Sequence, residues 1–145
     1  MRGKKYRPRA VNPFAHLVAI QGAALLTLDD RVRWALQIED AITAVQTAKA
    51  DVSHWTAIFD AVNLVEQLVL DGYAKDTDGI VEAAQQACVD IMDRRVKSGA
   101  RAVRSTELAA LRTLAGAWAD LIDNLTHQQR RASEERLAHR IRRAL

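Results

Sequence analysis

Residues 51–72, with the sequence DVSHWTAIFDAVNLVEQLVLDG, have the pattern of a single amphipathic α-helix. Asp51 or Ser53 can cap the exposed amides at its start, and Gly72 can adopt the left-handed conformation that often ends a helix. Between these limits, apolar side chains recur every three or four positions and form one face. That face consists of Trp55, Ile58, Phe59, Val62, Val65 and Val69. The segment therefore predicts a buried helix and favours an all-α protein.

The same spacing continues on both sides of this helix and predicts four more. We expect them at about 13–28, 30–48, 78–98 and 106–145, with caps at Asn12, Asp29 or Asp30, Asp76 or Asp78, and Ser105. The inner faces of the first two should include Leu25, Leu28 and Val32. At 1.5 Å per residue the last helix would be about 60 Å long, more than the others can cover. Its end would therefore project, break and fold back, or pack on another subunit.

Short connections between successive helices favour antiparallel neighbours. The expected fold is an all-α, antiparallel up-and-down bundle of four to five helices with a long C-terminal helix. A chain of 145 residues suits one domain with one core. We divide it into an extended basic arm at 1–11, the bundle at 12–129 and the arginine-rich end of the last helix at 130–145.

The location of the protein is inferred from its cysteine content and its apolar segments. Cys88 is the single cysteine, which excludes an internal disulfide framework and fits a reducing compartment. The basic N-terminus followed by apolar residues resembles a secretory signal, but Pro13, His16 and Gln21 interrupt that pattern. No run approaches the ~18 uncharged apolar residues that span a bilayer. We expect a cytoplasmic protein without a membrane span.

Positive charge is concentrated at the two ends of the chain. Residues 1–9 hold five basic residues and no acid, and residues 130–145 have a net charge of +4. Residues 10–129 contain ten basic and sixteen acidic residues, a net charge of −6. The ends are therefore the parts expected to meet a polyanion.

Both ends are candidate contacts for nucleic acid. Cations and a tyrosine around Pro8 predict an extended arm that neutralises phosphates while Tyr6 stacks or donates a hydrogen bond. Three C-terminal arginines would share one face of a helix. The candidate residues are Arg2, Lys4, Lys5, Tyr6, Arg7, Arg9, Arg136, Arg140 and Arg143. The C-terminal segment is also amphipathic, so it could instead lie on an anionic membrane or enter a partner groove.

The alternative partner is a protein. Trp34 lies off the apolar stripe of its predicted helix, and an exposed tryptophan often marks a binding surface. The chain would then be an inhibitor or adaptor that acts on a host complex through Trp34 or the acidic body. Equally, Trp34 could pack beneath the first helix. A homodimer formed through the long last helix is compatible with either partner.

Residue spacing gives no support for an enzyme. The four histidines, at 16, 54, 127 and 139, have no partner at metal-ligand spacing, and the glycines are too scattered for a phosphate-binding loop. Acidic neighbours such as Asp120 and Asp123 are explained as solvated helix faces, because no nucleophile is paired with a base. Cys88 lies on an inner stripe and should be a core residue. We expect no catalytic residue, no metal site and no cofactor.

Four segments together resemble a known group of proteins. They are KKYRPR at 4–9, the following NP at 12–13, ADVSHWTAIFDAVNLVEQL at 50–68 and STELAALRTL at 105–114. The chain resembles a family of small uncharacterised helical proteins from temperate phages and prophages of proteobacteria. The first helix of this chain is richer in alanine and its C-terminus richer in arginine than that family's pattern. The resemblance implies a role in phage biology in the cytoplasm of a bacterial host, and it carries over no functional residue.

Overall fold

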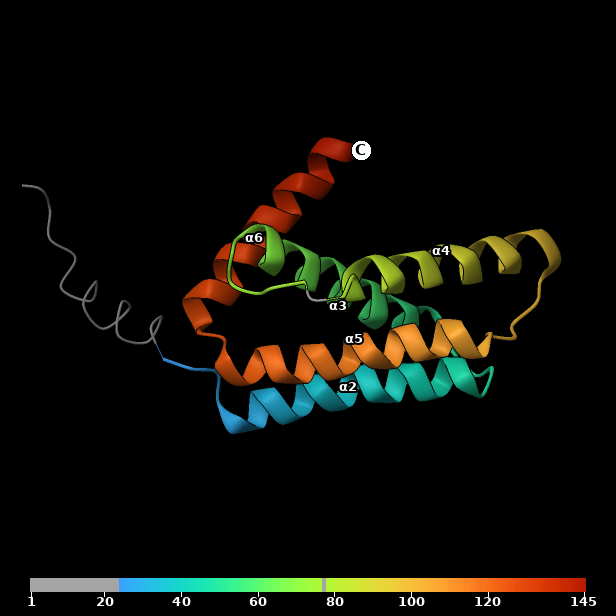
Figure 1. Cartoon of the computed structure of the whole chain (residues 1–145), viewed down its shortest axis with the longest axis horizontal. Coiled ribbons are helices and arrows are strands. Elements are labelled where there is room, and N and C mark those ends of the chain that lie inside the picture. Colours follow the sequence, from blue (N-terminus) through green and yellow to red (C-terminus); the bar gives the residue numbers. More distant parts are fainter. Residues whose placement is uncertain (1–23, 77) are drawn as a thin grey trace, which may run out of the picture.

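The computed structural model describes residues 24–76 and 78–145, and this part of the chain folds as an all-helical bundle (Figure 1). Its helices are α2 (Leu28–Gln46), α3 (Val52–Leu70), α4 (Ile80–Ser98), α5 (Ser105–Asn124) and α6 (His127–Ala144). Successive helices among α2–α5 run in opposite directions, and α2 and α5 lie side by side (Figure 1). The predicted antiparallel bundle is confirmed.

Helix α3 is central to this arrangement, because it contacts each of the other four described helices. Asp51 caps it as predicted, accepting hydrogen bonds from the amides of Ser53 (2.9 Å) and His54 (3.1 Å). The hydrogen bonding is reciprocal, because His54 Nδ1 accepts from the Asp51 amide at 3.1 Å. This histidine therefore belongs to a capping box. Beyond the helix, Gly72 has a φ of +79°, as its predicted role requires.

Three of the expected helix starts are wrong by a few residues. Thr27 caps α2 by accepting from the Asp30 amide at 3.2 Å, so Asp29 and Asp30 lie inside the first turn. Gly79 precedes α4, although the Asp76 carboxylate still accepts from the Val81 amide at 3.2 Å. Ser105 is the first residue of α5 and not its cap. In α2 and α4 an oxygen of a residue nearby in sequence accepts from the unpaired amides, whereas at α5 the Glu107 carboxylate accepts from the Arg104 amide at 2.8 Å.

The expected helix at 13–28 meets the described residues only at its end, where it is wrong. Residues 24–27 are not helical, and Leu28 begins α2. Leu25 and Leu28 are exposed at 53% and 69%, and Val32 on α2 at 48%. Leu26 is buried instead, and its amide donates to the Leu125 carbonyl at 3.3 Å. The apolar stripe assigned to the interior therefore lies on the surface at this end of α2.

The long C-terminal helix expected at 106–145 is two helices. The chain turns at Leu125, which is 2% exposed and has extended backbone angles (φ −88°, ψ 133°). Thr126 then caps α6, since its hydroxyl accepts from the Gln129 amide and the Gln129 side chain accepts from the Thr126 amide, both at 3.1 Å. The Ala24 carbonyl accepts from the His127 amide at 3.1 Å. These contacts hold the break, and α6 folds back onto α3.

The core lies among α2, α3, α4 and α5 and is closed at one end by Leu26 and Leu125. Cys88 belongs to it, as predicted. None of the described helices combines the length and the low charge needed to cross a bilayer.

Candidate functional site on helix α6

Helix α6 is fastened to the end of α3 by a buried serine. Ser133 is fully buried, and its hydroxyl donates to Asp71 Oδ2 at 2.5 Å. Gln67 donates to Asp71 Oδ1 at 3.0 Å, and Arg136 lies 3.2 Å from the same oxygen. Burial raises the pKa of Asp71, but the hydrogen bonds from these three side chains outweigh it and leave the pKa below its ordinary value. Asp71 is therefore held as a carboxylate in the joint between α3 and α6.

Two of the three predicted C-terminal phosphate contacts take part in this joint. The Tyr73 side chain and Asp71 both raise the pKa of Arg136. Arg140 donates to Glu66 on α3 at 2.8 Å. The shared face of Arg136, Arg140 and Arg143 is real, but its first two members lie against acids of the bundle. Any phosphate that they contacted would compete with Asp71 and Glu66.

Other arginines of α6 remain in solvent. Arg131, Arg142 and Arg143 are exposed, and within residues 24–76 and 78–145 none of them forms an ion pair. The Nε of Arg142 donates to the Ala138 carbonyl of its own helix at 3.2 Å. In Figure 1 the C-terminal part of α6 extends away from the bundle, so Arg142 and Arg143 lie at the projecting end. This end presents cationic side chains without a bulky neighbour.

The remaining predicted contacts, Arg2, Lys4, Lys5, Tyr6, Arg7 and Arg9, lie outside the described residues. Residues 24–145 alone carry sixteen basic and eighteen acidic residues, a net charge of −2. Within them, α6 is a basic helix on an acidic body. A polyanion would therefore be attracted to α6 and repelled by most of the remaining surface.

Trp34 is half-buried rather than fully exposed. The Arg130 guanidinium carbon lies 3.5 Å from the centre of its ring, which is a cation–π contact between α2 and α6. Arg130 also lies 2.8 Å from Glu134, one turn further along α6. A partner that used the face of Trp34 would have to displace Arg130.

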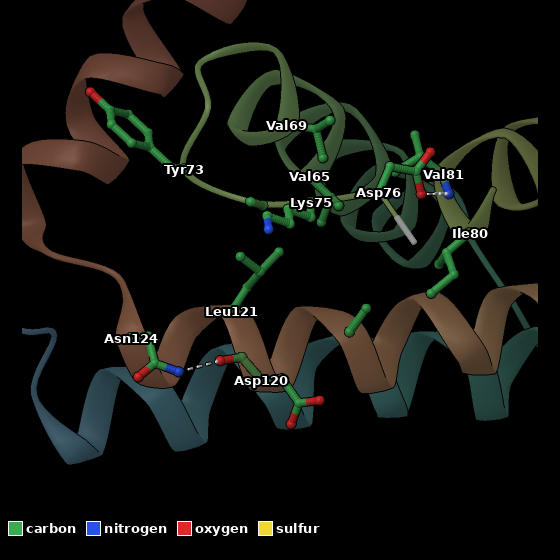
Figure 2. A pocket seen from close by; sticks show the side chains of 12 residues that line it. Val65, Val69, Tyr73, Lys75, Asp76, Ile80, Val81, Asp120, Leu121 and Asn124 are labelled. Carbon is green, nitrogen blue, oxygen red and sulfur yellow. Dashed lines mark hydrogen bonds between the residues drawn. The ribbon is translucent and has the colours of Figure 1, made fainter. Parts of the chain in front are cut away.

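A cavity of about 350 Å³ opens where α3 ends, α4 starts and α5 ends (Figure 2). Lys75 lies between Val65 and Leu121 in this view, while the Tyr73 hydroxyl points away toward α6. The volume is at the small end of the range for ligand sites. Asp76 is already used to cap α4 and Tyr73 to hold Arg136. The cavity is thus explained by the convergence of three helix ends.

Several surface carboxylates, Asp123 among them, lie beside basic side chains. Asp123 pairs with Arg31 at 3.4 Å, Glu39 lies 3.9 Å from Arg112, and Asp40 lies 3.6 Å from His54. Burial raises the pKa of the Cys88 thiol to about 11, so the thiolate nucleophile is scarce at neutral pH. No group of three potential metal ligands occurs within the described ranges.

Sequence reasoning missed the acidic side of the α3–α6 joint. Glu66 and Asp71 lie on one flank of α3, and Arg140 and Arg136 meet them in antiparallel order. The available signal in the sequence was the similar spacing of the two sets: the acids are five residues apart, and the arginines are four residues apart. The pairs are more than sixty residues apart, so no local pattern connects them.

Comparison with known proteins does not add a relative, because no protein-family model, no curated protein and no solved structure matches this chain.

Proposed function

We propose that this chain is a non-enzymatic protein that associates with nucleic acid through residues 1–9 and the outward arginines of α6. The observation that carries the proposal is the exposure of Arg131, Arg142 and Arg143, while Arg136 and Arg140 fasten the helix to α3. Binding would be driven by charge, because phosphates release counterions when arginine or lysine neutralises them. The family resemblance supports a setting in the cytoplasm of a bacterial host during phage growth.

A matched pair of triple variants tests the part played by α6. R131Q/R142Q/R143Q removes the outward charges, and R33Q/K97Q/R101Q removes three charges from exposed positions elsewhere on the body. Fluorescence anisotropy with a labelled DNA duplex and an RNA strand of mixed sequence, at low salt, measures the dissociation constants. We expect the α6 variant to bind at least tenfold more weakly, because each lost phosphate contact contributes roughly a kcal/mol.

The control variant has the same net charge, so general attraction between protein and phosphate falls equally in both. Equal weakening by the two variants would remove α6 from the interface. Absence of binding by the unaltered chain at low salt would remove the proposal altogether.

A second function, binding to a host protein as an inhibitor or adaptor, is favoured by one surface. Leu25, Leu28, Val32 and Leu36 are exposed at 53%, 69%, 48% and 62%, and the last three follow one line along α2. Contiguous apolar patches of this kind often mark protein interfaces. The replacement L28Q/L36Q, which does not change the net charge, should abolish a nuclease-resistant partner in affinity capture while leaving nucleic-acid binding intact. If that variant still captured the partner, the α2 surface would be excluded as its binding site.

The homodimer expectation rested on a projecting 60 Å helix. The break at Leu125 shortens that helix to His127–Ala144, which packs on α3, so the argument from the length of one continuous helix no longer applies. Sedimentation at micromolar concentration tests the dimer, which would give a species near twice 16.1 kDa.

A further inference from the structure

A groove lined by apolar and acidic side chains runs along the junction of α3 and α6. Two adjoining cavities of about 190 and 250 Å³ form it, and they share Asp60, Leu64 and Glu134. Trp34 and Trp118 line the first cavity, and Leu137 and Ile141 line the second. The groove thus combines apolar walls with carboxylates.

Asp60 is the carboxylate without a cation. Glu134 is paired with Arg130, whereas Asp60 has no ion pair among the residues that the structure describes. Partial burial raises the pKa of Asp60, the direction expected when desolvation is uncompensated. A positive side chain placed beside it would relieve that cost.

Trp118 provides a second unsatisfied group in the same groove. Its side chain is part of the core at 6% exposure, and its indole Nε1 has no acceptor within the described ranges. Buried indole N–H groups usually have a hydrogen-bond partner. The Trp118 Nε1 has almost no accessible surface, so an acceptor in the groove would reach it only after local opening.

One cationic side chain of the protein, Arg130, already lies in this groove. The Arg130 guanidinium lies on the face of Trp34 and beside Glu134. A tryptophan face and a carboxylate are the two groups that hold an arginine or lysine side chain. Arg130 already occupies both of these groups, and Asp60 offers a further carboxylate in the same groove.

We propose that this groove binds the basic segment at residues 1–9 of the same chain. The segment carries five cations, a tyrosine and a proline, which complement the carboxylates and the apolar walls. The inference rests on the proposed function in one respect: nucleic acid and the groove would compete for residues 1–9.

Chain connectivity makes this occupant accessible. The chain enters the described body at Ala24, which bonds to His127, and Arg130 lies one turn further along α6. Fourteen residues, 10–23, separate the basic segment from that point. They span about 21 Å as a helix and nearly 50 Å when extended, against about 17 Å along α6 from Arg130 to Ile141. With an effective concentration near millimolar, even an affinity of about 0.1 mM would keep the groove occupied.

The test uses the indole resonances of the full chain without nucleic acid. The variant R2Q/K4Q/K5Q/R7Q/R9Q neutralises the segment, and ¹H–¹⁵N spectra follow the N–H signals of the three tryptophans. We expect the signals of Trp34 and Trp118 to shift. Trp55 packs against Phe59 outside the groove, so its signal should stay in place and serves as the internal control.

Two further variants assign the effect to the groove. D60N in the unaltered chain should shift the same two signals in the same direction, whereas E135Q, an equal charge change on the exposed side of α6, should not. Unmoved signals in the neutralised variant, or equal effects of D60N and E135Q, would overturn the proposal. Shifts that vanish on dilution would assign the groove to a second copy and overturn it too. None of these readouts depends on nucleic-acid binding, so each proposal can fail alone.

Discussion

Replacing Ser133 with alanine tests how α6 is held. The Ser133 hydroxyl donates to Asp71 at 2.5 Å, and the Asp71 side chain is 8% exposed. Hydrogen bonds to charged groups contribute about 1.5–3 kcal/mol. Asp71 would keep Gln67 and Arg136, and alanine leaves little empty space, so we expect the low end of that range, about 1.5 kcal/mol.

The loss should appear first as local opening, because α3 is the described helix against which α6 packs most extensively. Native-state amide hydrogen exchange resolves such opening helix by helix. A loss of about 1.5 kcal/mol corresponds to roughly tenfold faster exchange of the α6 amides. S98A is the matched control, because the Ser98 hydroxyl donates to the Arg94 carbonyl at an exposed helix end. It should change exchange little.

The pH dependence of α6 protection follows from the lowered pKa of Asp71. A carboxyl with a lower pKa in the folded state stabilises the fold above its unfolded pKa, and that contribution is lost as the pH falls through the folded value. We expect α6 protection to weaken on acidification in the unaltered chain and to do so less steeply in S133A. Equal exchange in S133A and S98A, or an unchanged pH profile, would refute the joint as described.

Three further predictions concern the bundle. R94M removes the basic partner of Glu107, which is 5% exposed, and leaves its charge buried. We therefore expect urea unfolding to show a loss of stability of about 3 kcal/mol. A loss below 1 kcal/mol would contradict the importance of the pair. A48G should stabilise the fold by roughly 0.5–1 kcal/mol in the same assay, since Ala48 has a φ of +57°, and a destabilised variant would argue against that backbone. Iodoacetamide should modify Cys88 far more slowly at pH 8 in the native chain than in urea, given its pKa of about 11; equal rates would mean an accessible thiol.

Local signals were sufficient for the bundle because caps and apolar spacing agree where helices begin and end. Asp51 and Gly72 bound α3 as expected, and Gly99, with a φ of +69°, follows α4. The break at Leu125 escaped periodicity because that leucine continues the apolar spacing of α5 while its backbone leaves the helix. The Thr126–Gln129 capping box was the one local sign of it.

The site was less predictable because its contacts are non-local. Helical spacing correctly placed Arg136, Arg140 and Arg143 on one face, but it does not specify what that face meets. Glu66 is seventy-four residues from Arg140. Such pairs depend on how α6 crosses α3, which is set by packing around Ser133 rather than by any pattern within α6.

The central claim is that the basic N-terminal segment and the outward face of α6 bind a polyanion through phosphate charge. The salt dependence of duplex DNA binding tests it most directly, for the full chain and for R2Q/K4Q/K5Q/R7Q/R9Q. Each phosphate contact contributes about 0.9 to the magnitude of the slope of log K against log salt, so the five replacements should reduce that magnitude by about 4.5. An identical slope in both chains would contradict the account.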